Sequence, residues 1–283
     1  MLNIVFFIAA PFIALLMQGV QRKIAARMQN RRGPPVLQPF YDVAKLLGKK
    51  SIKSKNDLFF KIAPLLYLIA IYAIFIVLPP SLASFDYDFI FLFYMVMLAN
   101  AFYILGGISS DSPYSITGSM REMFLMVCFE ITMAVAVFTF IIYSHTLSFS
   151  GIVPMAMLYL PLASICMIAV ALAEVKITPF DTAEAETEIL PGVDTEYAGK
   201  QLMFLDVAKS MKMLFYVMFL PVLFVGVQNA FLFIMAAIVI FLAITFAQAA
   251  MPRYGVEVTY RELSIILLLA VAEFVRVSWG IGW

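Results

Sequence analysis

Long runs of apolar residues, separated by shorter polar segments, dominate the hydrophobic pattern of this chain. Eight of these runs are close to the 20 or so residues that a helix needs to cross a bilayer. The predicted spans lie at about 2–20, 59–79, 89–108, 123–143, 152–173, 206–226, 230–250 and 262–281. The pattern therefore predicts an all-α integral membrane protein, in which about eight transmembrane helices form a single membrane domain over residues 1–283.

The composition agrees with a lipid environment. Hydrophobic residues make up 64% and charged residues 13% of the chain, against about 45–50% and about 25% in soluble domains. A soluble fold of this size could not keep so much apolar surface away from water. The composition excludes a soluble enzyme, a disordered chain and a nucleic-acid-binding protein, so the lipid bilayer is an expected partner and nucleic acid is not.

The positive charges are concentrated in alternate loops. Of the 19 Lys and Arg residues, all except Arg276 lie in or beside the segments 21–58, 109–122, 174–205 and 251–261. Loops rich in Lys and Arg stay on the cytoplasmic side of a membrane. We therefore expect these segments, two of them long, to be cytoplasmic and both termini to lie outside.

The first of these loops combines a rigid turn with an amphipathic segment. A Gly-Pro-Pro sequence at 33–35 interrupts any helix, and after Pro39 apolar residues recur at helical spacing with lysines between them. The spacing predicts a short amphipathic helix that lies on a surface. Either this segment binds anionic lipid, or it docks a soluble subunit with Arg31, Arg32 and Gly33 held in the turn.

The third of these loops is strongly acidic. Six carboxylates fall within sixteen residues: Asp181, Glu184, Glu186, Glu188, Asp194 and Glu196. Like charges that lie close together in a partly dry crevice raise one another's pKa and titrate as a coupled group, which suits them to passing protons. The alternative is a solvated acidic loop without such a role.

Ionisable residues also occur at membrane depth. Glu130 lies inside the fourth span, where an unpaired carboxylate costs about 2.5–3.5 kcal/mol on insertion scales. Glu122, Glu174 and Asp206 lie at the inner boundaries of neighbouring spans. We expect Glu130 to face the bundle interior and these acids to form a polar route from the acidic loop to mid-membrane. Alternatively, Glu130 only bonds to a neighbouring helix.

Two further charged residues lie in the last span. Glu273 and Arg276 are three residues apart, so on a helix they can form an ion pair on one face. They lie toward the outer end of this span. The pair is either structural or the outer exit of a charge path.

The chain lacks the motifs of a chemical active site. It has no phosphate-binding or dinucleotide-binding glycine motif, no HExxH and no spaced cysteine cluster, and its single histidine excludes paired haem ligands. Its two cysteines, Cys128 and Cys166, lie in apolar runs. We therefore expect no catalytic, metal-binding or cofactor-binding residue in this chain.

Three stretches of the sequence resemble one known family. The first loop reads Gln21-Arg-Lys, Arg27-Met-Gln, Arg32-Gly-Pro and then Gln38-Pro-Phe with Asp42 and Lys45-Leu. The acidic loop reads Glu174, Thr178-Pro-Phe-Asp181, Glu184-Ala-Glu186, Glu188 and Thr195-Glu196-Tyr-Ala, and Met251-Pro-Arg-Tyr precedes the last span. In this order they resemble the H-type membrane subunit of respiratory complex I and of the related energy-converting membrane-bound NiFe hydrogenases.

The resemblance implies a non-catalytic subunit of an ion-translocating oxidoreductase complex in the prokaryotic cytoplasmic membrane. Such a subunit anchors a peripheral redox arm and links its electron transfer to H⁺ or Na⁺ translocation. The implied partners are a peripheral iron–sulfur subunit, a NiFe-hydrogenase-like large subunit and antiporter-like membrane subunits. The iron–sulfur clusters and the NiFe centre would then belong to those partners.

The resemblance also assigns residues to these roles. The peripheral arm would dock on Arg27, Arg31, Arg32, Gly33 and Pro34. The ion pathway would include Glu130, Glu174, Asp181, Glu184, Glu186, Glu188, Glu196 and Asp206, and we add Glu122 because of its place at the inner boundary.

Two features favour the hydrogenase branch over complex I. The first loop is compact, and the second loop, Ser109-Ser-Asp-Ser-Pro-Tyr-Ser, departs from the usual sequence. The alternatives are the equivalent subunit of a quinone-reducing complex I or of a sulfur-reducing relative. Two hypotheses of other kinds are a passive membrane anchor without a coupling role and an independent secondary transporter, which the long docking loops disfavour.

Overall fold

Helices make up all the regular structure in the residues that the computed structural model describes, which are 2–50, 58–183 and 192–280. The α-helices are α1 (Leu2–Met28), α2 (Gln38–Gly48), α3 (Leu58–Ile74), α4 (Asp88–Ile108), α5 (Pro113–Ser144), α6 (Pro161–Glu174), α8 (Lys200–Phe224), α9 (Ala230–Ala250) and α10 (Val256–Ser278). The short 3₁₀ helices are η1 (Phe149–Gly151), η2 (Ala156–Leu158) and η3 (Gly192–Glu196). No strand occurs in these ranges, as the predicted all-α fold requires.

Each predicted span coincides with one α-helix, and α2 is the predicted amphipathic segment. By length and composition, five helices among the described residues could cross a membrane: α1, α4, α5, α8 and α9. Two others, α3 and α6, are apolar but shorter, with 17 and 14 residues. The predicted helical bundle of an integral membrane protein is therefore confirmed.

Two helices are shorter than predicted, and a proline explains the late start of one of them. The predicted span 152–173 is helical only from Pro161, because proline has no N–H to donate and favours the first turn of a helix. α3 ends at Ile74 rather than at 79, and turns lead from it to the Pro79-Pro80 dipeptide. In contrast, α8 begins at Lys200 rather than at 206, so its lysines lie within the helix.

α8 forms the centre of the bundle. A helix that is apolar on nearly all sides must be covered all round, and 89% of the residues in the most apolar segment of α8 are buried, against 22% in α1 and in α9. Aromatic side chains from other elements pack onto it. Phe219 of α8, for example, contacts Phe89 of α4 and Phe149 of η1.

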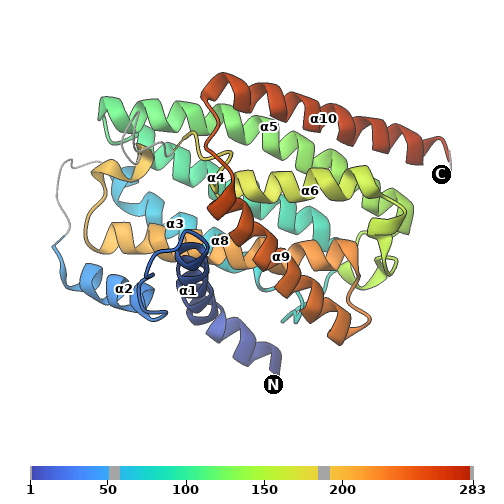
Figure 1. Cartoon of the computed structure of the whole chain (residues 1–283), viewed down its shortest axis with the longest axis horizontal. Coiled ribbons are helices and arrows are strands. Elements are labelled where there is room, and N and C mark those ends of the chain that lie inside the picture. Colours follow the sequence, from blue (N-terminus) through green and yellow to red (C-terminus); the bar gives the residue numbers. More distant parts are fainter. Residues whose placement is uncertain (1, 51–57, 184–191, 281–283) are drawn as a thin grey trace.

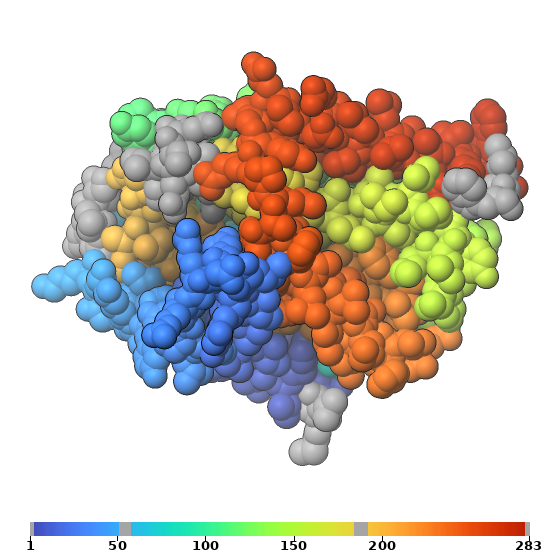
Figure 2. Space-filling view, viewed as in Figure 1, coloured from blue at the N-terminus to red at the C-terminus, as the bar shows by residue number. Residues whose placement is uncertain are grey.

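Most helices run along the long axis of the molecule, and two cross them (Figure 1). α3, α4, α5, α6 and α8 lie lengthwise, whereas α1 and α9 run obliquely across the near face. Figure 2 shows α9 and its connection to α10 covering the middle of this face, between the blue α1–α2 region and the yellow-green α6 region. α2 lies at one end of the bundle, against α1 and α8.

The four segments predicted to be cytoplasmic meet at one end of the bundle. Arg253 pairs with Asp181, Gly199 lies against the backbone of Lys49, and Gly118 at the start of α5 approaches η3. These contacts join the segments 21–58, 109–122, 174–205 and 251–261. We call this end of the molecule the loop end.

Gly118 lets α5 and η3 approach each other closely at the loop end. A Cβ atom on Gly118 would lie 2.7 Å from the Cα atom of Gly192, whose own φ of +58° lies in the left-handed region. A side-chain carbon does not fit at that distance from backbone atoms. The position of η3 therefore depends on glycine at 118.

Gly118→Ala should lower the free energy of unfolding by about 1–3 kcal/mol, because the added methyl group forces α5 and η3 apart. The matched control is Gly48→Ala at the end of α2, where no atom lies within 4 Å of the Cβ position. Thermal unfolding of the purified chain in detergent, followed by far-UV circular dichroism, measures both variants. An unchanged midpoint for Gly118→Ala would contradict the close contact.

Candidate functional site

Four buried polar residues meet inside the apolar bundle. Asn100 of α4, Glu130 of α5, Glu174 of α6 and Lys212 of α8 are each at most 5% exposed. We call these four residues the deep cluster. Each residue comes from a different helix, so the cluster forms only when the four helices pack together.

Lys212 and Asn100 connect the two carboxylates of the deep cluster. The Nζ atom of Lys212 lies 2.6 Å from Oε2 of Glu174 and donates a hydrogen bond of 2.8 Å to Oδ1 of Asn100. The amide Nδ2 of Asn100 donates to Oε1 of Glu130 at 3.2 Å and to Oε2 of Glu174 at 3.1 Å. Asn100 thus accepts from the cation and donates to both acids.

The charges of the deep cluster do not cancel when both carboxylates are ionised. One ammonium group faces two carboxylates, and Glu130 makes no salt bridge with any residue that the structure describes. Its hydrogen bond comes from the neutral amide of Asn100. A buried charge without a counter-charge is costly, so gain or loss of a proton at Glu130 changes the balance of the whole cluster.

A second group of charged residues lies between the deep cluster and the loop end. We call it the loop-end cluster, and it consists of Tyr103, Glu122, Lys176, Asp194 and Lys209. Lys176 Nζ lies 3.1 Å from Oε1 of Glu122 and 3.6 Å from the centre of the Tyr103 ring. The Tyr103 hydroxyl donates to Asp194 at 3.1 Å, and Lys209 pairs with the same carboxylate. Among the described residues of this cluster, two ammonium groups face two carboxylates.

On α4 and on α8, the residue that belongs to the deep cluster and the residue that belongs to the loop-end cluster lie on the same face of the helix. Asn100 and Tyr103 are three residues apart on α4, and Lys209 and Lys212 are three residues apart on α8. Side chains at this spacing are neighbours on a helix surface. One residue of each pair belongs to the deep cluster and the other to the loop-end cluster.

α5 and α3 complete the connection between the clusters. Glu122 and Glu130 lie about two turns apart on α5. The buried phenol of Tyr67, from α3, is close enough to Lys212, Lys176 and Glu122 to interact with them electrostatically. The two clusters therefore form one buried polar region that runs from the loop end into the bundle.

The structure brings four of the predicted pathway residues together. Glu130 and Glu174 belong to the deep cluster, and Glu122 belongs to the loop-end cluster. Asp206 is half-buried one turn before Lys209 on α8 and interacts with it electrostatically. The predicted polar route from the inner boundary to Glu130 corresponds to this group.

The remaining pathway residues lie elsewhere or are not described. Asp181 pairs with Arg253 at the loop end, and Glu196 is half-buried at the end of η3. Three predicted residues lie outside the described residues: Glu184, Glu186 and Glu188.

The predicted docking residues lie at the end of α1 and in the turn that follows. Arg27, Arg31, Arg32 and Pro34 are exposed. Gly33 packs against α1, since a Cβ atom there would lie 2.9 Å from that of Ala26. The turn therefore folds back on α1 and leaves the guanidinium groups at the surface.

Glu273 and Arg276 lie at the opposite end of the bundle from both clusters. Two hydrogen bonds of 2.9 Å join the guanidinium group of Arg276 to the fully buried carboxylate of Glu273. Arg276 also donates to the carbonyl oxygen of Tyr159 at 2.7 Å. Tyr159 precedes the first turn of α6, whereas Glu174 ends that helix, so the pair links α10 to the far end of α6.

The hydrophobic pattern did not single out the residues that complete the two clusters. Lys209 and Lys212 lie near the predicted start of a span at 206, and the structure places both inside α8 among carboxylates. Asn100 and Tyr103 were not singled out. One feature of the sequence points to these residues: in each of two mostly apolar helices, two polar residues lie three positions apart.

Tyr197 places a buried hydroxyl group beside the loop-end cluster. Its ring stacks on Phe60 with the ring centres 4.4 Å apart, and its Oη atom has no hydrogen-bond partner among the described residues. Burial, together with the nearby Asp194 carboxylate, raises the pKa of this hydroxyl. Tyr197 therefore stays neutral and protonated at physiological pH.

Nearly the whole chain matches one protein family. Residues 1–277 match the family model described as NADH dehydrogenase. The chain belongs to the NADH dehydrogenase family. The predicted resemblance to the H-type, complex I-like membrane subunits is confirmed at this level, and members of this family are subunits of membrane oxidoreductase complexes.

Relatives in this family include subunits of NADH-quinone and NADH-ubiquinone oxidoreductases from several organisms. The H subunit of the NADH-quinone oxidoreductase of Syntrophotalea carbinolica is 32% identical over 240 residues, 76% of this chain and 73% of the relative. The H subunit numbered 2 of the same enzyme in Rhizobium etli is 30% identical over 272 residues, which cover 85% of this chain and 80% of the relative. NADH-ubiquinone oxidoreductase chain 1 of Strongylocentrotus purpuratus is 30% identical over 288 residues, which cover 90% of this chain and 89% of the relative.

A solved structure shares the fold over almost the whole chain. It is described as the membrane-bound sulfane sulfur reductase (MBS), an archaeal respiratory membrane complex. The match has a TM-score of 0.88 with 22% identity and covers 97% of this chain and 98% of that one. At this identity the match establishes the fold of this NADH dehydrogenase family member.

Lys212→Met should lower the free energy of unfolding by about 3–5 kcal/mol, because it leaves Glu174 buried without its cation. The matched control is Arg22→Gln, which removes an exposed salt bridge to Asp42 and should change stability by about 0–1 kcal/mol. Thermal unfolding in detergent measures both. The double variant Lys212→Met/Glu174→Gln should recover part of the lost stability. If Lys212→Met and Arg22→Gln change stability by equal amounts, Lys212 is not a buried counter-ion of Glu174.

Proposed function

We propose that this chain is the membrane-anchor and coupling subunit of an ion-translocating oxidoreductase complex. It docks a peripheral redox arm at the loop end and links electron transfer in that arm to H⁺ or Na⁺ translocation through its buried carboxylates. The observation that carries this proposal is the joined pair of clusters, which leads from the loop end into the apolar bundle. The chain itself catalyses no reaction.

A change of charge at the loop end acts on the deep cluster through the electric field. One to two helical turns, about 5–11 Å, separate the clusters along the helices that carry them. Two unit charges about 8 Å apart interact by about 2 kcal/mol at an effective dielectric constant of about 20. Moving one charge against 100 mV costs about 2.3 kcal/mol, so the two magnitudes are compatible.

The deep cluster supplies the group that responds to this field. Lys212 and Glu174 form a fixed ion pair, and Asn100 holds Glu130 against it. Electrons that arrive in the docked arm make the loop end more negative, which favours proton uptake at Glu130. Their departure favours proton release, so Glu130 alternates between two charge states while its partners stay in place.

A groove on the outer surface supports an exit toward neighbouring membrane subunits. Glu130 lies in a surface groove of about 430 Å³ between α4 and α5, together with apolar side chains such as Phe93, Val127 and Phe138. A carboxylate at membrane depth needs a polar partner or water on its open side. We place the antiporter-like membrane subunits against this groove.

The loop end supports docking of the peripheral arm. Exposed Arg27, Arg31 and Arg32 surround a turn that is fixed against α1, and guanidinium groups recognise carboxylates on a partner surface. The excess of Lys and Arg at this end supports a cytoplasmic location for it, with both termini outside, and we take the membrane to be that of a prokaryotic cell. The partner here would be the peripheral iron–sulfur subunit.

For the redox arm we favour a NiFe-hydrogenase-like large subunit. The compact first loop and the Ser109–Ser115 segment support this branch. A sulfur-reducing arm is the second candidate, because the chain spans 98% of its structural relative in a sulfane sulfur reductase. A quinone-reducing arm is the third.

Glu130→Gln should uncouple the complex, because glutamine keeps a hydrogen-bonding group beside Asn100 but cannot ionise. We expect electron transfer from a soluble donor to stay within about twofold of wild type, and ion uptake into sealed vesicles to fall about tenfold or more. The matched control is Glu262→Gln, which removes a carboxylate at the loop end of α10 that is paired only with its neighbour Arg261 in the described structure.

Unchanged ion uptake in the Glu130→Gln complex would exclude Glu130 from the pathway. If neutralising Glu122, Glu130 and Glu174 affects only assembly and never coupling, the chain is a passive anchor. Ion flux through the purified chain alone would instead indicate an independent transporter.

The identity of the redox arm has a separate test. The large peripheral subunit that co-purifies with this chain should contain two CxxC pairs, which would hold a NiFe centre, and the complex should evolve hydrogen. A large subunit without these cysteine pairs would exclude the hydrogenase branch but leave the coupling role intact.

A further inference from the structure

One aromatic side chain at the loop end contacts two cations. The centre of the Tyr103 ring lies 3.6 Å from Nζ of Lys176 and 5.4 Å from Nζ of Lys209. Both distances are within the roughly 6 Å over which an ammonium group is attracted to the face of an aromatic ring. Tyr103 is buried, and such contacts are stronger away from water.

The shared ring brings two like charges close together. The Nζ atoms of Lys176 and Lys209 are no more than 9.0 Å apart, which is the sum of their distances to the ring centre. Two ammonium groups at this separation repel each other. A further carboxylate between them would offset the repulsion but would also change the charge of the cluster. An aromatic ring attracts both cations and adds no charge.

The backbone at Lys176 supports a role for its side chain. At the end of α6 the N–H of Ile177 donates to the carbonyl oxygen of Leu172 at 3.0 Å, and Lys176 has a φ of +56°. Glycine is the usual residue at this left-handed position after a helix, because a side chain there is strained. The chain has a lysine instead, whose ammonium group lies over the Tyr103 ring and 3.1 Å from Oε1 of Glu122.

The hydroxyl group of Tyr103 contacts another part of the loop end. It donates to Oδ1 of Asp194 in η3 at 3.1 Å, and Oδ2 of the same carboxylate pairs with Lys209. In the sequence, Lys176 precedes the acidic residues of 184–188 and Asp194 follows them. Through its ring and its hydroxyl group, Tyr103 therefore contacts both described flanks of the acidic loop.

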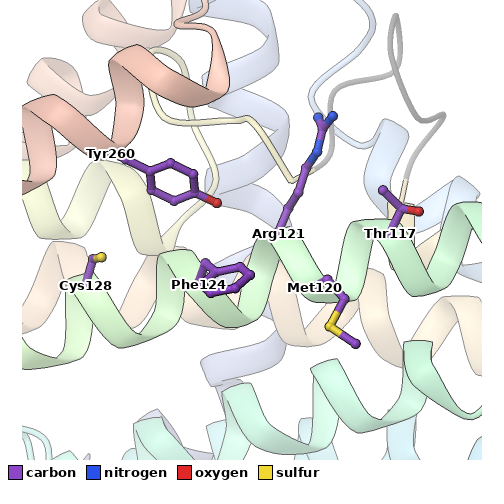
Figure 3. A pocket seen from close by; sticks show the side chains of 6 residues that line it. All are labelled: Thr117, Met120, Arg121, Phe124, Cys128 and Tyr260. Carbon is purple, nitrogen blue, oxygen red and sulfur yellow. The ribbon is translucent and has the colours of Figure 1, made fainter.

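Contacts from α3 and α5 support this arrangement. The buried Tyr67 of α3 packs against Tyr103 with the ring centres 5.4 Å apart. Arg121 extends away from α5 (Figure 3), and its Nη1 atom donates to the carbonyl oxygen of Thr182 at 3.4 Å. The ring is thus supported from α3, and the flank that carries Lys176 is also attached to α5.

We propose that Tyr103 is a positioning residue of the coupling path. Its ring holds the ammonium groups of Lys176 and Lys209 next to each other, and its hydroxyl group holds Asp194. The two ion pairs of the loop-end cluster therefore respond to a change of charge as one unit, and Asn100, about one turn away on α4, connects this unit to the deep cluster. This role rests on the proposed coupling function, whereas the contacts of the ring do not.

The test compares Tyr103→Phe with variants that carry a phenylalanine with one, two or three fluorine atoms at this position. The hydroxyl group is absent throughout. Fluorine withdraws electrons from the face of the ring, so the attraction for cations decreases stepwise while the ring keeps nearly the same size. The thermal midpoint of the purified chain in detergent should fall by about 2–4 °C over the series. In sealed vesicles, the number of ions that the complex takes up per electron should fall stepwise, by about two- to fivefold in total.

The matched control is the same series at Phe140, a fully buried ring of α5 that packs against the ring of Phe224 with the centres 6.4 Å apart. Ion uptake per electron should not follow the number of fluorine atoms there. Equal ion uptake by all the ring variants at 103, or the same decline at both positions, would overturn the proposal. So would a midpoint that falls in order while ion uptake does not.

Failure of the proposed function gives a different result. If the complex with the unchanged chain takes up no ion during electron transfer, the coupling function is refuted, and with it the part of Tyr103 in coupling. The midpoint series still measures the ring in that case. An ordered decline supports the contact of the ring with the two cations, and a constant midpoint overturns it.

Discussion

One buried ammonium group constrains the packing of the whole bundle. Lys212 lies in the middle of α8, where an uncompensated charge would cost several kcal/mol. Folding must therefore bring the Glu174 carboxylate and the Asn100 amide to it, from α6 and α4. Asn100 in turn holds Glu130 of α5. Because these contacts require all four helices at once, α8 becomes the helix around which the others pack, and the same requirement creates the candidate site.

The short α6 is part of this arrangement. A helix of 14 residues extends about 21 Å, less than the roughly 30 Å of a hydrocarbon core, so the chain after Glu174 is irregular close to membrane depth. Irregular backbone is tolerated there only where protein or a polar cavity surrounds it. The structure meets this condition: Ile177 and Phe180 are buried, and the Pro179 carbonyl oxygen accepts from the N–H of Tyr254. Ending α6 early thus places a carboxylate beside Lys212.

The sequence predicted the helices well because apolar runs are a local signal, and α6 starts later than predicted because Pro161 suits the first turn of a helix. The acids of the site were predicted in part, since Glu122, Glu130 and Glu174 stand out in or beside apolar runs. Their partners were not. Lys212 lies 112 residues from Asn100, and only tertiary packing shows that a lysine near a loop is a buried counter-ion rather than a surface charge.

The charged groups differ between the loop end, the deep cluster and the opposite end of the bundle. Within the described residues, the loop-end cluster holds two ammonium groups and two carboxylates, the deep cluster holds one ammonium group and two carboxylates, and the pair of Glu273 and Arg276 at the opposite end is fixed to a backbone carbonyl. Under the proposed coupling role, a charge displaced from the loop end would act on Glu130 first, since an ion pair resists a change that an acid without a cation among the described residues accommodates with a single proton. Glu130 also lines a groove between α4 and α5, so under the proposed coupling role the side of the bundle at that depth is a more direct exit for a proton than the far end of the bundle.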